Sequence, residues 1–435
     1  MINRYRLRKL LAPTAGIWKA ISIVAIGLAC FFLGIALSFK IIIEPFLDST
    51  QALTDRTLSQ FVPVESLDHA RHYLAGVLLF LGIYLLWRGS SFAVQKIIDT
   101  VTGRKGSSAD YIRQQMLAQG PRIVALGGGT GLSTILRGLK VYSSNITAIV
   151  TVTDDGGSSG KLIKEKGMIP PGDIRNCLVA LADAEKAMTD LFQHRFKADS
   201  GALSGHSIGN LLIAALADQS QGDFEGAIEQ ASKVLNIRGQ VVPSTLSHVG
   251  LRAVLDDGRE VCGETRIVES ARRIRRIFLE PGDVEAYRVA VEAILDADLI
   301  CIGPGSVYTS VIPNLLVPSI AEALGNSKAK RVYICNVMTQ SGESDQFTAS
   351  EHVTAIQANI EKQLFDYVML NTANPTPLLV EKYREQGQHI VEPDIDRVKA
   401  MGYKVIAGNF MSESDVVRHD PAKLATRLIQ LVERG

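Results

Sequence analysis

Two short β-branched runs with a helix-patterned stretch between them constrain the fold of this chain most strongly. Residues 123–126 and 146–152 are apolar runs that end in glycine or acidic residues, and residues 132–140 between them follow an amphipathic helical pattern. This order is typical of a βαβ unit, which implies a parallel sheet and a right-handed crossover. Further buried strands are predicted at residues 299–302, 331–335, 367–370 and 404–407. We therefore expect an α/β fold built on a mostly parallel sheet.

Two other local patterns predict elements outside that sheet. Residues 251–255 and 260–263 flank the sequence Asp-Asp-Gly, which favours a tight turn between antiparallel strands. Asp420 and Pro421 are typical of the N-cap and the first position of a helix, which we expect to run over residues 421–433.

The amino-terminal part of the chain contains two apolar runs. Residues 20–39 include no charged side chain and are bracketed by Lys19 and Lys40. A helix of this length covers about 30 Å, the thickness of the hydrocarbon core of a bilayer. The second run is shorter, but arginine side chains at its ends can reach the bilayer interface. We predict a transmembrane hairpin with spans at about 20–39 and 72–90.

The basic residues around these runs predict their orientation. Lys and Arg side chains gather before the first run and after the second, whereas residues 41–70 hold Arg56 as their only basic residue beside five acidic ones. The positive-inside rule then places both termini in the cytoplasm and predicts a multi-pass protein of the cytoplasmic membrane. A cleaved signal peptide and a buried helical hairpin of a soluble core are the alternatives.

These patterns divide the chain into three parts. Residues 1–100 hold the predicted membrane hairpin, and residues 101–120 form a basic linker with a short helix over 110–119. Residues 121–435 carry the α/β pattern and are long enough for a large core.

Composition excludes several classes of protein. The formal net charge is +1, so there is no overall basic character of the kind that nucleic-acid binding requires, and we expect no nucleic-acid partner. The five cysteines are scattered without a C-x-x-C pair, which excludes a zinc ribbon and a disulfide framework.

A glycine-rich loop follows the first predicted strand and opens a helix. In this position glycines let the backbone approach an anion, and the free N–H groups of the helix start favour a phosphate. The loop lacks the last glycine of a dinucleotide fingerprint, and the chain has no Walker A sequence. A tight strand-to-helix turn is the alternative. The candidate ligand-binding residues here are Gly127, Gly128, Gly129, Thr130 and Gly131.

Paired acids and a run of glycines and serines follow the second predicted strand. Because the carboxyl ends of parallel strands share one edge of a sheet, this segment is expected beside the glycine loop. The carboxylates are candidate Mg²⁺ ligands, and the Gly/Ser run suggests a flexible lid. A solvated turn is the alternative. The candidate residues are Asp154, Asp155, Gly156, Gly157, Ser158 and Ser159.

Later polar loops add further candidates. Two of them enter helices, and a second glycine-rich loop follows the strand at 299–302, where it suits another part of a ligand. A lone histidine is more often structural than a base, and four arginines at 272–276 are most simply a solvated face. The candidates here are Asn176, His206, Asn210, Gly303, Gly305, Ser306, Tyr308 and Thr309.

Taken together in their order along the chain, these motifs strongly resemble the YvcK-like family, whose members are labelled gluconeogenesis factors and belong with the CofD-like superfamily. The resemblance covers about residues 121–432 and includes Cys335-Asn-Val-Met-Thr-Gln340. It implies a Rossmann-like domain with helices on both faces of the sheet. It also implies binding of a nucleotide sugar, UDP-N-acetylglucosamine, and a role in cell shape and cell-wall precursor control.

The resemblance implies further ligand residues and one alternative activity. Asn336, Tyr383 and Arg418 match ligand-contacting motifs of the family; a tyrosine can stack on a base, and an arginine can bridge a diphosphate. The CofD relatives are phospholactyl transferases, so a Mg²⁺-dependent transferase using a nucleotide diphosphate donor is the alternative to a non-enzymatic regulator. Cell-wall synthesis proteins are the expected partners, and a homo-oligomer stays open.

Overall fold

The computed structural model describes most of the chain from residue 108 onward. It covers residues 108–435 except 185, 198, 414–415 and 434–435, and earlier in the chain only residues 48–49, 52–53, 56–57, 87–88 and 91. Contacts divide the chain into Met1–Met116 and Leu117–Gly435, and the second unit is described here. Apart from residues 87 and 88, the predicted spans 20–39 and 72–90 lie outside the described residues.

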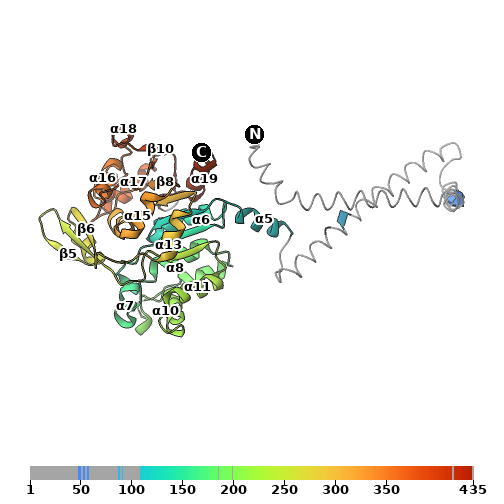
Figure 1. The fold of residues 1–435 in the computed structure, drawn as a ribbon, viewed down its shortest axis with the longest axis horizontal. Helices are drawn as coiled ribbons and strands as arrows, with labels where there is room; N and C mark the ends of the chain where they lie inside the picture. The colour runs from blue at the N-terminus through green and yellow to red at the C-terminus, as the bar shows by residue number, and fades with distance from the viewer. Residues whose placement is uncertain are drawn as a thin grey trace. The chain divides into compact units, whose positions relative to one another are not determined.

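A seven-stranded sheet forms the centre of the second unit (Figure 1), and every neighbouring pair of strands is parallel. Its strand order is β10-β9-β8-β7-β1-β2-β3. The predicted parallel α/β sheet is therefore confirmed. The strands are β1 (Ile123–Gly127), β2 (Ile146–Val150), β3 (Gln240–Pro243), β7 (Leu299–Ile302), β8 (Lys330–Ile334), β9 (Tyr367–Asn371) and β10 (Lys404–Gly408).

Helices cover both faces of this sheet, and the alternation of side chains along β1 shows why. Ile123 and Ala125 point into one apolar core, whereas Val124 and Leu126 point into another on the opposite face. A strand that is buried on both faces reads as a continuous apolar run, which is the pattern of β1. The first core contains α6 (Gly129–Leu139), α8 (Gly172–Leu181), α10 (Ile208–Gln219), α11 (Phe224–Leu235) and α19 (Pro421–Glu433); the second contains α13 (Arg288–Leu295), α14 (Ile312–Leu316), α15 (Pro318–Asn326), α16 (Ala349–Asn359) and α18 (Ile395–Ala400).

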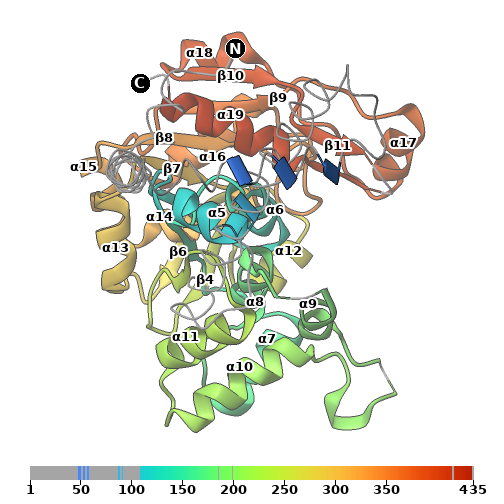
Figure 2. The same cartoon turned by 90° about the vertical axis from the view of Figure 1, so that its right-hand side faces the viewer.

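Shorter elements surround these layers. Figure 2 shows α7, α9 and α10 at the end of the domain opposite α18 and β10. The remaining helices are α5 (Ser108–Ala118), α7 (Gly157–Lys166), α9 (Lys186–Gln193), η2 (Gly201–Leu203), α12 (Glu264–Glu269), η3 (Val307–Val311) and α17 (Pro377–Glu385). Two small antiparallel sheets contain β4 (Gly250–Leu255), β5 (Glu260–Cys262) and β6 (Ile274–Glu280), and β11 (Met411–Glu413) and β12 (Val417–His419).

Several local predictions are confirmed. The hairpin around Asp-Asp-Gly is β4–β5, and its two strands pair antiparallel. The last helix is α19, over the predicted residues, and the Oδ1 atom of Asp420 accepts hydrogen bonds from the backbone N–H groups of Ala422 and Lys423. Four strands, β3, β6, β11 and β12, are not predicted. Strand β3 has four residues and ends in Pro243 at an edge of the sheet, so its apolar signal is too short to identify.

No single helix among the described residues is both long enough and apolar enough to span a membrane. One bent pair of helices, Val307–Leu316 and Pro318–Asn326, meets the criteria of length and composition only when its two parts are taken together.

The order of the strands creates a switch point between β1 and β7. From β1 the chain proceeds through β2 to β3 on one side, and β7 then starts the other half of the sheet on the opposite side of β1. In open α/β sheets, ligands bind outside the carboxyl ends of the strands at such a point. Both glycine-rich loops lie there, because one follows β1 and the other follows β7.

The two glycine loops touch each other at Gly131. A Cβ atom at this position would lie 2.4 Å from the backbone oxygen of Pro304 and 3.0 Å from the Cα atom of Gly305. Both atoms belong to backbone, so a side chain cannot be accommodated by a change of rotamer. The absence of a side chain at Gly131 therefore allows the two halves of the sheet to meet at their carboxyl ends.

This contact predicts that alanine at Gly131 destabilises the protein, which is the opposite of what helix propensity predicts. Alanine normally stabilises a helix relative to glycine by up to about 1 kcal/mol, and Gly131 lies inside α6. We expect Gly131→Ala to lower the thermal unfolding midpoint instead, because the new methyl group collides with Pro304. The matched control is Gly325→Ala in α15, where nothing lies within 4 Å of the new Cβ atom. Equal or higher stability of Gly131→Ala would contradict the close contact.

Candidate functional site

A cavity of about 640 Å³ opens at the switch point, and both glycine loops line it. Its size lies within the usual range for small-molecule sites. The walls come from the loops after β1, β2, β7 and β8, from the starts of α8 and α12, and from α17 and β12. The lining includes Gly128, Gly129, Thr130, Gly131, Thr134, Asp154, Asp173, Glu264, Gly305, Ser306, Thr309, Ser310, Asn336, Gln340, Glu343, Tyr383, Gln388, Arg418 and His419.

The start of α6 forms one wall of the cavity. Its N-cap is Gly128, which has no side chain to accept from the first N–H groups of the helix. Gly129 has a φ of +62°, a conformation that glycine adopts without strain. Gly128 could not carry a side chain either, because a Cβ atom there would lie 2.5 Å from the Asp173 carboxylate. The loop therefore presents backbone without side chains to the cavity. The N–H of Gly129 is bonded to the Asp173 carboxylate, so an anion at this helix N-terminus would be bound by the N–H groups of Thr130 and Gly131.

The second glycine loop is held in place by one side chain. The side-chain amide of Asn336 donates to the backbone oxygen of Gly305 at 2.9 Å, and its Oδ1 atom accepts from the Gly305 N–H at 3.1 Å. This pair of hydrogen bonds ties the loop after β7 to the end of β8. Asn336 thus fixes the shape of the cavity while also lining it.

Four carboxylates line the cavity: Asp154, Asp173, Glu264 and Glu343. Burial raises the pKa of Asp173 to about 6, and the Asp154 charge adds to this effect. Burial also raises the pKa of Glu343 to about 7, against hydrogen bonds from Thr309 and neighbouring groups. The pKa of Glu264 rises to about 9 through burial and the charges of the other three carboxylates. These carboxylates therefore favour the binding of a proton, a cation or a hydrogen-bond donor.

Several buried polar atoms at the cavity have no hydrogen-bond partner among the described residues. They are Oε1 of Gln340, Oε2 of Glu343 and both ring nitrogens of His419. Burial lowers the pKa of His419 to about 4, so its ring is neutral at pH 7 and one nitrogen is an acceptor. Unpaired buried polar atoms are costly, and a ligand that donates hydrogen bonds would satisfy the oxygens of Gln340 and Glu343 and the acceptor nitrogen of His419.

Tyr383 and Arg418 lie at the mouth of the same cavity. The Tyr383 hydroxyl accepts from the backbone N–H of Val417 at 2.9 Å, which ties α17 to β12 and fixes the ring. Arg418 is exposed, and its side chain makes no hydrogen bond or ion pair with another described residue. Its guanidinium is thus available to an anionic ligand.

The structure brings half of the predicted ligand residues to this cavity. Eleven of them line it: Gly128, Gly129, Thr130, Gly131, Asp154, Gly305, Ser306, Thr309, Asn336, Tyr383 and Arg418. The other eleven lie behind this lining or away from it: Gly127, Asp155, Gly156, Gly157, Ser158, Ser159, Asn176, His206, Asn210, Gly303 and Tyr308.

The residues outside the lining have identifiable contacts. Ser158 contacts Nδ1 of His206 at 3.0 Å and accepts from the Asn210 amide at 3.0 Å, which makes a buried network. The Tyr308 hydroxyl donates to the backbone oxygen of Ile274, and Asn176 accepts from a neighbouring arginine. These hydrogen bonds stabilise the loops behind the cavity.

The paired acids differ from each other in the structure. Asp154 lines the cavity, whereas Oδ1 of Asp155 accepts from the backbone N–H and the hydroxyl of Thr265. The Gly/Ser run after them, predicted as a flexible lid, forms the first turn of α7 instead. Glycine at the N-cap and at the first helical position allows the chain to enter the helix directly, since Gly157 has a φ of +47°.

Three of the four cavity carboxylates, Asp173, Glu264 and Glu343, are not among the residues predicted from the sequence. Asp173 belongs to the Pro-Gly-Asp-Ile-Arg-Asn motif, so a local signal for it existed. Glu264 begins α12 and Glu343 follows β8, and neither lies in a recognisable motif. In the described part of the chain, no group of three or more His, Cys, Asp or Glu side chains is already arranged to hold a metal ion.

Comparison with known proteins now identifies the family. The family model described as "2-phospho-L-lactate transferase CofD" matches residues 123–411. The chain belongs to the CofD family. It is 47% identical over 318 residues to the gluconeogenesis factor of Bacillus subtilis, covering 73% of this chain and all of that protein. It is also 47% identical to the gluconeogenesis factor of Halalkalibacterium halodurans, over 71% of this chain and 95% of that one.

A solved structure agrees with this placement. A crystal structure of a member of the UPF0052 family from Bacillus halodurans is similar with a TM-score of 0.68 and 46% sequence identity. The match covers 71% of this chain and 99% of that one. The predicted resemblance to the CofD-like gluconeogenesis factors is therefore confirmed at the level of family and fold.

The raised pKa values predict how stability depends on pH. Folding raises the pKa of Glu264 from 4.5 to about 9, so between these values the folded protein binds more protons than the unfolded chain. The free energy of unfolding should therefore fall as the pH rises from about 5 to about 9. We expect Glu264→Gln to raise the unfolding midpoint at pH 8.5 by at least about 2 °C and to flatten this dependence.

Thermal unfolding without divalent cations at several pH values tests this prediction. Glu361→Gln, an exposed position outside the cavity, is the control and should behave as the wild type. A Glu264→Gln protein with an unchanged pH dependence would refute the electrostatic description of the cavity.

Proposed function

We propose that the cavity binds a nucleotide sugar, UDP-N-acetylglucosamine, and that the protein is a regulator that responds to this ligand. The observation that supports the proposal most directly is the presence of two sets of groups in the lining of one cavity. The bare backbone of the first glycine loop and Arg418 suit a diphosphate, and the unpaired acceptors suit hydroxyl and amide groups.

The diphosphate is assigned to the start of α6. The first N–H groups of a helix and its dipole favour an anion, and the bare Gly128–Gly131 backbone allows close approach. Arg418 can reach the same anion from β12 and bind it in bidentate fashion. The ring of Tyr383, which its hydrogen bond to Val417 holds in place, is available to stack on the base.

The sugar is assigned to the unpaired acceptors of the lining. Sugar hydroxyls and the N-acetyl N–H donate hydrogen bonds, and Gln340, Glu343 and His419 carry buried atoms that lack a donor. Each such bond would remove the cost of a buried unpaired atom, so specificity for a polyhydroxylated ligand follows.

A Mg²⁺ ion would bind between Asp154 and the phosphate oxygens of the ligand. Mg²⁺ prefers oxygen ligands and is usually held by one or two carboxylates together with phosphate oxygens and waters. Asp154 is the favoured protein ligand, because it lines the cavity and Asp155, which is bonded to Thr265, does not; one oxygen of Asp154 accepts from the Gly156 N–H, and the other would hold the ion. A cation there would also offset the repulsion among the cavity carboxylates and between them and a diphosphate.

A regulatory role and a membrane location complete the proposal. The relatives are named gluconeogenesis factors, and the name of the family model describes a phospholactyl transferase, which is the alternative activity. The predicted hairpin at 20–39 and 72–90 would tether the domain to the cytoplasmic membrane. There it would meet partners in cell-wall synthesis, on which control of cell shape depends.

Substitution of Arg418 tests the proposed ligand. Isothermal titration of the full chain with UDP-N-acetylglucosamine should show binding, and Arg418→Ala should weaken it about tenfold or more, since a charge-assisted hydrogen bond contributes about 1.5–3 kcal/mol. Arg275→Ala, at an exposed position on β6, is the matched control and should bind normally. Absence of binding, or product formation from a guanylylated lactate donor, would reject the regulator in favour of the transferase.

Substitution of Asp154 and of its neighbour Asp155 tests the proposed Mg²⁺ site. We expect Mg²⁺ to strengthen binding of the nucleotide sugar by the wild type and this gain to be lost in Asp154→Asn. Asp155→Asn should keep it, because that side chain lies outside the cavity lining. Titrations with and without Mg²⁺ decide the matter, with unfolding midpoints as a check of folding. Equal loss in both variants would argue against Asp154 as the ligand.

A further inference from the structure

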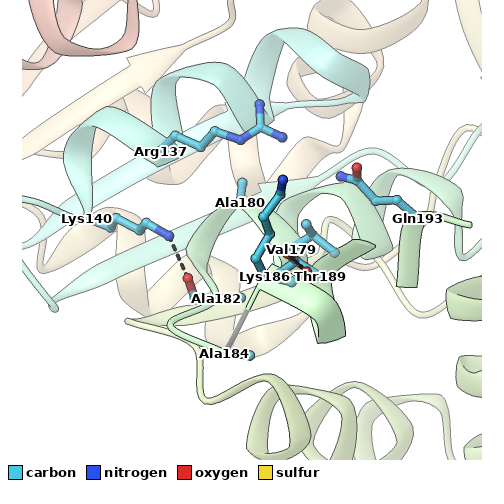
Figure 3. Close-up of a pocket in the computed structure, with 9 residues that line it drawn as sticks. All are labelled: Arg137, Lys140, Val179, Ala180, Ala182, Ala184, Lys186, Thr189 and Gln193. Carbon is cyan, nitrogen blue, oxygen red and sulfur yellow. Dashed lines mark hydrogen bonds between the residues drawn. The ribbon is translucent and has the colours of Figure 1, made fainter. Parts of the chain in front are cut away.

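A second cavity, of about 440 Å³, lies at the other end of α6 (Figure 3). Its walls come from the last turn of α6, the end of α8 and the length of α9. We call it the basic pocket, because three of its side chains are cationic. It is lined by Arg137, Lys140, Val179, Ala180, Ala182, Ala184, Lys186, Thr189 and Gln193.

The cations of the basic pocket form no ion pair with a carboxylate among the described residues. Neither Arg137 nor Lys186 makes an ion pair with a described carboxylate, and Lys140 donates to the backbone oxygen of Ala182 at 2.6 Å. The nearby carboxylate of Asp183 is paired with Arg238 at 2.5 Å. Three positive charges therefore border one cavity, and the one described carboxylate whose charge acts on Lys140, that of Asp183, is already paired with Arg238.

The surroundings of Lys140 and Arg137 lower the pKa of each side chain. Burial lowers the pKa of Lys140; the charge of Asp183 acts against this, and the charges of Arg238 and Arg137 lower the pKa further. Burial and the charge of Arg418 lower the pKa of Arg137. An anion in the pocket would reverse both effects, since an opposite charge favours the charged form of a base.

Helix dipoles explain only part of this arrangement. Arg137 and Lys140 lie at the C-terminal end of α6, where a cation is favourable. Lys186 is the first residue of α9, where the helix dipole disfavours a cation. Figure 3 shows its side chain extending from α9 toward that of Arg137 on α6. An anion between the two side chains would give Lys186 a favourable partner.

We propose that the basic pocket binds a small phosphorylated metabolite. Its phosphate would lie between Arg137 and Lys186, as phosphates do between converging cations. The floor is apolar, because Val179, Ala180 and Ala182 are buried, and it would contact the carbon skeleton. Thr189 and Gln193 on α9 offer hydrogen-bonding groups for hydroxyls. The proposal is independent of which ligand the first cavity binds.

A local measurement is needed, because phosphates can also enter the first cavity. The rate at which Lys186 is acetylated is such a measurement. Lys186 is exposed, and an anion bound to its amine would slow the reaction. The full chain is acetylated with and without pyrophosphate, with sodium chloride keeping the ionic strength equal. Mass spectrometry then gives the rate at each lysine. Lys328, exposed and outside the pocket, is the internal control.

We expect pyrophosphate to slow acetylation of Lys186 at least about threefold and to leave Lys328 unchanged. Arg137→Gln should raise the pyrophosphate concentration needed for half-maximal protection about tenfold, whereas Arg275→Gln should not. A sugar phosphate should protect Lys186 at a lower concentration than pyrophosphate, because the apolar floor contacts its carbon skeleton. Equal protection of Lys186 and Lys328, or unchanged protection in a folded Arg137→Gln protein, would overturn the proposal.

Discussion

The close contact between Gly131 and Pro304 is the constraint on which the rest of the site depends. Strands β1 and β7 are parallel neighbours at the switch point, so the loops at their carboxyl ends must cross the same space. They can do so because Gly131 has no side chain to occupy the position of the Pro304 carbonyl. This packing directs the start of α6 into a cavity that both loops share.

The lining of that cavity combines groups that favour opposite charges. Backbone N–H groups at the start of α6 and Arg418 favour an anion, whereas Asp154, Asp173 and Glu264 favour a proton or a cation. A diphosphate alone would be repelled by the carboxylates, and a cation alone would gain nothing from the helix start. A ligand with a diphosphate, a bound divalent cation and a hydroxylated sugar would pair with the helix start and Arg418, with the carboxylates, and with the unpaired acceptors. This complementarity is the physical basis of the proposed function.

The sequence predicts the backbone of the site better than its side chains. Apolar runs and the strand–glycine–helix order identify the sheet and its functional edge, because these signals are local and both cores require continuous apolar strands. The lining of the cavity is not local: Glu264 and Glu343 arrive from segments far from the glycine loop. The choice between Asp154 and Asp155 depends on Thr265, more than a hundred residues away, so neighbours in sequence acquire different roles. The Gly/Ser run after them has turn-forming composition but enters a helix.

A crystal structure of the protein with UDP-N-acetylglucosamine and Mg²⁺ tests the central claim most directly. The account predicts the diphosphate at hydrogen-bonding distance from the backbone N–H groups of Thr130 and Gly131, with Arg418 on the same phosphates and the sugar against Glu343 and His419. A ligand bound outside the space between the two glycine loops, or one whose sugar occupies the start of α6 while its diphosphate lies elsewhere, would contradict it.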